Sequence, residues 1–168
     1  ASLAALRREQ WTSAAPIAGR LNPMNGVQRI TVHHEGTPRG NWDTSLAAVR
    51  QTLRLIRAQH VQRMRAGDIG YHYIVDRAGR LWQGRCERYQ GAHARAHNPH
   101  NIGVMLLGNF EIQHPTRPQI NTLRETCRRL IEGYRLSPDD LFAHRDLCAT
   151  ACPGSRLRSE EHTSELQS

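Results

Sequence analysis

Residues 102–107 read Ile-Gly-Val-Met-Leu-Leu, a nearly continuous apolar run without a charged side chain. A short run of this kind predicts a strand that is buried on both faces in the middle of a sheet. Such a strand needs neighbours on both edges and covering layers on both faces. The sequence on either side of it must therefore supply the neighbouring strands and the covering helices.

Three other stretches have the composition of strands. Residues 27–33 carry apolar side chains at alternate positions and include β-branched types. Residues 70–76 and 80–85 flank the sequence Arg-Ala-Gly at 77–79, which predicts a hairpin. A short segment at 141–144 leads into a loop around the last cysteine.

Two segments have the periodicity of helices. Apolar residues recur at helical spacing through residues 46–64 and again through residues 120–134. Asp43 is the expected N-cap of the first helix, and Gly67 suits its C-terminal cap. Pro118 is expected to open the second helix. Strands mixed with two substantial helices predict an α/β domain with a central sheet.

The length of 168 residues fits one domain. Residues 1–26 show no clear period and form a lead-in segment, and residues 27–157 hold all the predicted elements. Residues 158–168 read RSEEHTSELQS, which resembles the translation of a sequencing adapter, so we expect them to lie outside the domain. The chain begins at Ala1, so we expect it to start inside a longer reading frame or after processing. No signal peptide is visible, and no apolar run approaches the roughly 20 residues that span a membrane.

The chain is basic, with 23 arginines and no lysine and a net charge of +8. A basic surface favours anionic partners, such as cell-wall polymers, nucleic acid or acidic lipid, without choosing among them. The four cysteines are too few and too unevenly spaced for a disulfide scaffold. A disulfide between Cys86 and Cys127 stays open.

Ten histidines raise the question of which ones converge. His33 and His34 end the first strand, and only one of them can face a given site because neighbouring strand residues point to opposite faces. His144 precedes Cys152 by eight residues. One strand-end histidine plus this pair is a candidate three-ligand zinc site, with Cys148 as a competitor for the cysteine position. The alternative from spacing alone is that the strand-end histidine is only a hydrogen-bonding residue.

Several strings in the chain, taken together and in order, resemble one family. They are VHHEG at 32–36, DIGYHYIVDRAGRLWQGR at 68–85, GAH at 91–93, HNPHNIGVMLLGNF at 97–110 and AHRDL…TACPG at 143–154. The chain is similar over residues 28–157 to zinc-dependent N-acetylmuramoyl-L-alanine amidases and peptidoglycan recognition proteins, in the branch of the phage lysozyme-type amidases.

The resemblance implies a mixed sheet with helices packed on it, and it implies functional roles for individual residues. The Zn²⁺ ligands would be His33, His144 and Cys152, with Cys152 typical of the phage and recognition-protein branch. Tyr71 falls at the position of a catalytic tyrosine, the alternative being a core aromatic. His93 falls in a segment that borders the zinc cleft, where substrate contact and loop packing are both open. The neighbouring His72 should point away from the site and be structural.

Two departures from the family pattern concern catalysis. Phage members carry a catalytic lysine two residues before the zinc cysteine, and Thr150 stands there. The recycling amidases place a glutamate on the central strand, and residues 102–107 contain none. Tyr71 and Thr150 are therefore the candidates to donate hydrogen bonds to the oxyanion of the amide.

The resemblance predicts hydrolysis of the bond between the lactyl group of N-acetylmuramic acid and L-alanine, with peptidoglycan or muropeptides as partners. The alternative is a non-catalytic peptidoglycan-binding recognition module, which typically lacks the cysteine ligand. A metal-dependent nuclease is less favoured, because no nucleic-acid motif appears and the arginines are spread along the chain. We expect a monomer that acts outside the cytoplasm.

Overall fold

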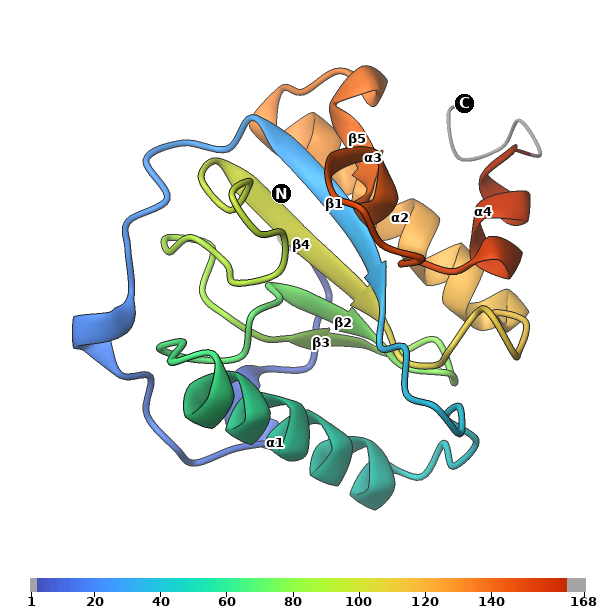
Figure 1. Cartoon of the computed structure of the whole chain (residues 1–168), viewed down its shortest axis with the longest axis horizontal. Helices are drawn as coiled ribbons and strands as arrows, with labels where there is room; N and C mark the ends of the chain where they lie inside the picture. The colour runs from blue at the N-terminus through green and yellow to red at the C-terminus, as the bar shows by residue number, and fades with distance from the viewer. Residues whose placement is uncertain (1–2, 163–168) are drawn as a thin grey trace.

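A five-stranded sheet forms the centre of the structure, a computed structural model that describes residues 3–162 (Figure 1). Its strands are β1 (Arg29–His34), β2 (Tyr73–Val75), β3 (Leu81–Gln83), β4 (Asn101–Leu106) and β5 (Leu141–Ala143). Their order is β3-β2-β4-β1-β5, and only β2 and β3 pair antiparallel. The prediction of an α/β domain with a mixed sheet, and of 102–107 as its central strand, is confirmed.

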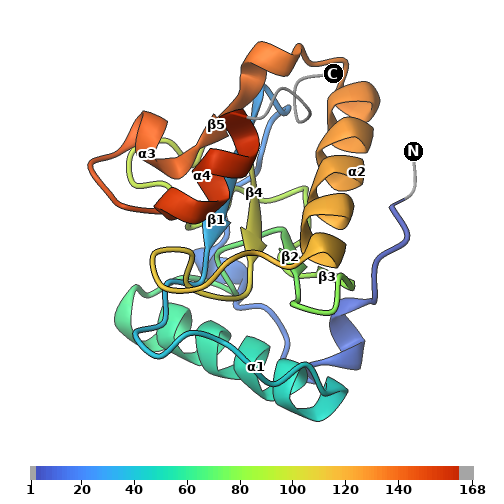
Figure 2. The same ribbon diagram turned by 90° about the vertical axis from the view of Figure 1, so that its right-hand side faces the viewer.

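Two long helices cover opposite faces of the sheet: α1 (Leu46–Arg63) and α2 (Arg117–Tyr134) (Figure 2). Successive side chains of β4 point alternately to the two faces of the sheet, each covered by one of these helices. Ile102, Val104 and Leu106 pack in the core beneath α2, whereas Met105 packs in the core beneath α1. Two shorter helices, α3 (His144–Leu147) and α4 (Ser155–His162), follow β5. Three 3₁₀ turns complete the elements: η1 (Arg8–Gln10), η2 (Ala18–Arg20) and η3 (Pro138–Asp140).

The ends of α1 differ from the sequence prediction. Ser45, not Asp43, is the N-cap, because its hydroxyl accepts from the N–H of Ala48 and Asp43 instead accepts from the N–H of Ser45. The helix ends at Arg63, before Gly67. Gly67 serves a different purpose: a Cβ there would lie 2.9 Å from the backbone oxygens of Ile17 and Arg20, so glycine lets the N-terminal segment approach this closely.

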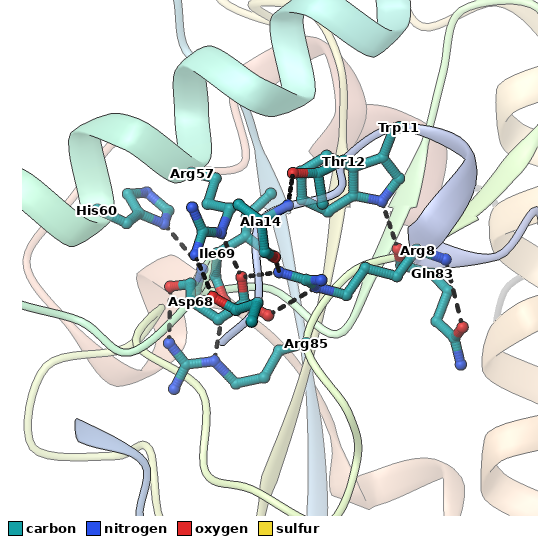
Figure 3. A network of polar contacts seen from close by, with 12 residues as sticks. Arg8, Trp11, Thr12, Ala14, Arg57, His60, Asp68, Ile69, Gln83 and Arg85 are labelled. Atoms are coloured by element: carbon teal, nitrogen blue, oxygen red, sulfur yellow. Dashed lines mark hydrogen bonds and ion pairs between the residues drawn. The ribbon is translucent and has the colours of Figure 1, made fainter. Parts of the chain in front are cut away.

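Part of the lead-in segment packs onto the domain. Trp11 is only 1% exposed, and its indole N–H donates to the carbonyl of Gln83 at 2.8 Å. A buried carboxylate fastens the same segment (Figure 3). Asp68 accepts from the guanidinium groups of Arg8 and Arg57 at 2.8–2.9 Å. The N-terminal segment and α1 are thus joined through one acidic side chain.

The C-terminal part of the described chain is also anchored. Leu157 is fully buried in the core beneath α2, and α4 runs through the expected boundary at 157 as far as His162. The remainder of the suspected tail, 163–168, lies outside the described residues. Cys86 and Cys127 are not joined by a disulfide. None of the helices in the described part of the chain combines the length and apolar character that crossing a membrane requires.

Candidate functional site

Strand pairing brings two of the predicted metal ligands together. β5 lies parallel to β1, and Val32 is paired with Ala143. The residues that follow this pair are His33, the last but one residue of β1, and His144, the first residue of α3. Their rings lie 4.5 Å apart between centroids. Two histidines that are more than a hundred positions apart therefore meet because their strands are neighbours with matched ends.

Cys152 completes the group from the loop between α3 and α4. One ligand atom from each of His33, His144 and Cys152 lies within 4.8 Å of the others. Cys152 Sγ lies 3.7 Å from His33 Nδ1. Zinc bonds of about 2.0–2.3 Å at tetrahedral angles place sulfur and nitrogen ligands about 3.6 Å apart, so these donors fit a zinc ion. Cys148, the competitor from the sequence, instead has its thiol against the carbonyl of Arg95.

The two adjacent histidines of β1 face opposite sides, as predicted. His33 is 1% exposed and joins the metal group. His34 lies on the other face, where its Nδ1 accepts from the N–H of Phe110. The backbone N–H of His34 points at Cys152 Sγ at 3.3 Å. Burial raises the pKa of the Cys152 thiol to about 12, and this N–H opposes the rise. A bound cation would favour the thiolate far more strongly.

His93 holds the second nitrogen of His33. Its Nδ1 lies 2.8 Å from His33 Nε2, and its own Nε2 lies 3.1 Å from the carbonyl of Asn101. A carbonyl only accepts, so His93 carries its proton on Nε2, and its Nδ1 accepts a hydrogen bond from the Nε2–H of His33. His33 Nδ1 is then left as a lone pair facing the metal group. Burial lowers the pKa of His93 to about 3, which keeps it neutral.

The sequence left two roles open for His93, substrate contact and loop packing, and its surroundings bear on the choice. The side chain is 7% exposed, and a Cβ on Gly103 would lie 2.6 Å from its ring. It is enclosed by the chain and bonded to a predicted ligand, so loop packing describes its contacts better than substrate contact. The neighbouring His72 is also enclosed, between the N–H of Gly103 and the carbonyl of Tyr89, as expected of a structural residue.

Tyr71 and Thr150 lie beside the three ligands. The ring of Tyr71 is 5.2 Å from that of His33 between centroids. Burial, and then the charges of Cys152 and Glu35, raise the pKa of Tyr71, so its phenol stays protonated and can donate. The hydroxyl of Thr150 accepts from the N–H of Cys152 at 3.2 Å, which leaves its own proton for another acceptor.

A cleft of about 630 Å³ extends from Tyr71 along one side of α1. Residues from the segment 35–43 form one wall, α1 forms the other, and Met105 of β4 lies at its floor. Glu35, to which the sequence gave no role, lines this cleft. Its Oε1 accepts from Gly108 N–H and from the side-chain amide of Asn41, and burial raises the pKa of its carboxyl group.

His60 is a cleft residue that the sequence interpretation missed. Its Nδ1 accepts from the N–H of Gly70 at 2.8 Å, which leaves the proton on Nε2. Burial lowers the pKa of His60 to about 4, so the ring is neutral at pH 7. The available signal was its position: His60 continues the inward stripe of Leu53 and Ile56, where a polar side chain is unexpected.

Comparisons with known proteins show which family the chain resembles. The family model described as N-acetylmuramoyl-L-alanine amidase matches residues 23–155. The mouse N-acetylmuramoyl-L-alanine amidase is 32% identical over 95% of this chain, which spans 31% of that protein's length. Peptidoglycan-recognition protein SC2 of Drosophila melanogaster is 30% identical over 94% of this chain and 84% of its own length.

A solved structure shows the same architecture. The N-acetylmuramoyl-L-alanine amidase LysC from Clostridium intestinale superimposes with a TM-score of 0.79 at 26% identity, covering 98% of each chain. The family model covers most of the sequence, and the matched range includes the three candidate metal ligands and Tyr71. This chain belongs to the N-acetylmuramoyl-L-alanine amidase family.

Proposed function

We propose that this chain is a zinc-dependent N-acetylmuramoyl-L-alanine amidase. It would hydrolyse the amide bond between the lactyl group of N-acetylmuramic acid and L-alanine in peptidoglycan, and so act outside the cytoplasm. One observation carries the proposal: His33, His144 and Cys152 converge within 4.8 Å of one another beside Tyr71, which also lines the cleft.

The residues of the site would hold one Zn²⁺ and leave it one open position. His33 and His144 would bind through ring nitrogens, and Cys152 would bind as a thiolate. When bound, zinc lowers the pKa of a water molecule to about 7 and polarises an amide carbonyl. Three ligands, rather than four, are what a catalytic zinc site provides.

The neighbouring side chains supply orientation and hydrogen bonds. His93 fixes the tautomer of His33, so that Nδ1 faces the metal group. Tyr71 is protonated at neutral pH and would donate to the amide oxygen as charge develops on it. Thr150 has a free hydroxyl proton and would be a weaker second donor. Removing one donor of this kind typically costs about 3–4 kcal/mol of barrier.

The cleft would bind the substrate on either side of the bond that is cut. His60 presents Nε2–H into it and would donate to a carbonyl of the stem peptide or of the lactyl group. Because burial keeps this histidine neutral, it is a donor without a charge. Closely packed apolar residues such as Met105 at the floor would exclude water from around the amide.

The alternative is a recognition module that binds peptidoglycan without cutting it, since relatives named as recognition proteins share the family. The complete His-His-Cys set favours the enzyme, because a binding module has no need of a cysteine ligand.

The deciding experiment is mass spectrometry of purified muropeptides after incubation with zinc-loaded protein. The enzyme would release intact stem peptides and peptide-free glycan, and Cys152→Ala would abolish the release. Tight muropeptide binding by the wild type, with no release of stem peptide, would instead establish the recognition module.

A further inference from the structure

Trp42 stands out among the three tryptophans of the chain. Trp11 and Trp82 are buried at 1% and 0% exposure, whereas Trp42 is 68% exposed. It lines the cleft together with Asp43 and Ala48, near the N-terminal end of α1. His60 lies near the other end of α1, beside Tyr71. Twelve residues of helix separate Ala48 from His60, a length of about 18 Å. The cleft therefore extends well beyond the reacting bond.

The segment that carries Trp42 is held in place by a buried glutamine. Gln113 is 2% exposed, and its side-chain oxygen accepts from the N–H groups of Asn41 and Asn109 at 2.8 and 3.0 Å. Its amide nitrogen donates to the carbonyl of Asn41 at 3.0 Å. The indole N–H of Trp42 donates to the carbonyl of Arg39. The exposed ring is thus presented in one orientation, so binding to it costs little conformational entropy.

The charge beside the ring indicates which ligand it suits. The guanidinium of Arg77 lies 5.7 Å from the ring centroid and already supplies a cation to the electron-rich face. A second cation, such as the free ammonium of a stem peptide, would be repelled. A neutral ring with weakly positive C–H bonds would not be, and polar side chains of the same cleft, Thr52 and Gln59, can bond to its substituents. Pyranose rings have this chemistry.

We propose that Trp42 is a stacking platform for an N-acetylhexosamine of the glycan strand, at the end of the cleft distant from Tyr71. The inference rests on the proposed function, because peptidoglycan supplies the sugar. Its ligand is the glycan, and the peptide would occupy other parts of the cleft. The site would make the protein sensitive to glycan length.

Fluorescence tests the platform directly, because Trp42 is the exposed tryptophan. The trimer of N-acetylglucosamine should shift the emission to shorter wavelength and protect it from acrylamide quenching. Trp42→Ala should weaken trimer binding about five- to tenfold, in the range of one aromatic contact, and should abolish the emission change. Tyr89→Ala is the matched control, since Tyr89 is 37% exposed and lies outside this cleft.

Two outcomes would overturn the platform. One is trimer affinity that is the same in Trp42→Ala and wild type. The other is protection of Trp42 by a sugar-free stem peptide and not by the trimer. Thermal unfolding of each variant would show that the fold is retained, which is expected because the Trp42 ring is mostly in solvent.

Kinetics separate this inference from the proposed function. With a peptide linked to a longer glycan, such as a tetrasaccharide that can reach the far end of the cleft, Trp42→Ala should raise KM five- to tenfold and leave kcat unchanged. With N-acetylmuramoyl dipeptide, which lacks the additional sugars, both constants should match the wild type. An active enzyme whose preference for the longer glycan survives Trp42→Ala would refute the platform alone. An inactive protein that binds the trimer through Trp42 would refute the amidase alone.

Discussion

His93 and Asn101 decide which ring nitrogen of His33 carries its proton. The carbonyl of Asn101 accepts from His93, and His93 accepts from His33 Nε2. The result is a chain of two hydrogen bonds through two neutral rings, which leaves the lone pair of His33 on Nδ1. Hydrogen-bond partners of this kind set the orientation and basicity of a metal ligand, so His93 would be a positioning residue if His33 binds zinc as proposed.

His93→Ala should therefore weaken zinc binding by about 10- to 100-fold. The loss arises because His33 would lose its fixed tautomer and its second contact. Competition with a chelator of known affinity measures the change. His97→Ala on the same segment is the control and should bind zinc like the wild type. A zinc affinity of His93→Ala equal to that of the wild type would show that the hydrogen bond from His33 to His93 has no part in holding the metal.

Tyr71 and Thr150 differ in what they can donate. We expect Tyr71→Phe to lower kcat about a hundredfold or more with unchanged zinc content, because it removes a donor to the developing oxyanion. Thr150→Ala should cost less, because a water molecule can replace a half-exposed hydroxyl. Steady-state kinetics and metal analysis on both variants check the ranking. The reverse ranking would mean that the two donors are wrongly assigned.

At the scale of the elements, the position of the segment before β2 is fixed by one carboxylate, that of Asp68. Asp68 is 1% exposed and holds Arg8 of the N-terminal segment and Arg57 of α1 (Figure 3). Arg85 adds hydrogen bonds to the carbonyls of Asp68 and Ile69. These contacts fix the backbone that leads into Tyr71 two residues later, and so they connect the N-terminal segment to the geometry of the site.

Asp68→Ala should lower the free energy of unfolding by about 3–5 kcal/mol, because two mostly buried guanidinium groups would lose their partner. Urea denaturation measures this loss. Glu125→Ala provides the comparison, since Glu125 pairs with Arg128 and Arg129 on the exposed side of α2 and should change stability very little. Similar effects of the two substitutions would show that burial of the Asp68 network contributes nothing.

The last helix provides a test of the suspected tail. Leu157 is buried in the core, whereas residues 158–168 are mostly polar. Deletion of 158–168 should leave the fold and zinc content unchanged, while Leu157→Ala should destabilise the protein by about 2–5 kcal/mol. Thermal unfolding and metal analysis of the two variants give the answer. A deleted chain that unfolds like Leu157→Ala would show that the tail belongs to the domain.

At the scale of the whole molecule, buried neutral histidines make stability depend on pH. Burial lowers the pKa of His60 and of His72 to about 4, against about 6.5 in an unfolded chain. Above pH 6.5 both are neutral in both states and contribute no pH dependence. Between pH 6.5 and 4 the unfolded chain takes up protons that the folded protein does not, so stability falls as the pH falls.

The metal-free protein should therefore lose about 3 kcal/mol or more of its unfolding free energy between pH 7 and pH 4, because one pKa unit corresponds to about 1.4 kcal/mol. Urea denaturation at a series of pH values measures the slope. His60→Asn should flatten the slope, since asparagine does not titrate in this range. A stability that is constant from pH 7 to pH 4 would contradict the burial of neutral histidines.

The sequence by itself determined the central strands, the two long helices and the identity of the candidate ligands. An apolar run at 102–107 identifies a central strand because only a doubly covered strand tolerates such a composition. Alternation at His33 and His34 requires that one of them face each side, because the pleat has a period of two. The strings around His144 and Cys152 identified the family without any coordinates. All of these signals are local in the chain.

Only the tertiary structure decided which side chains meet. The pairing of Val32 with Ala143 brings His33 beside His144, and no local pattern encodes that register. The roles of His60 and His93 depend on which nitrogen faces which backbone group, and that depends on contacts between distant segments. The sequence did not distinguish Trp42 from other loop residues. Its exposure beside a cleft depends on how Gln113, which lies 71 positions away, holds the segment that carries it. Local chemistry selects the elements, whereas long-range packing decides which side chains can act together.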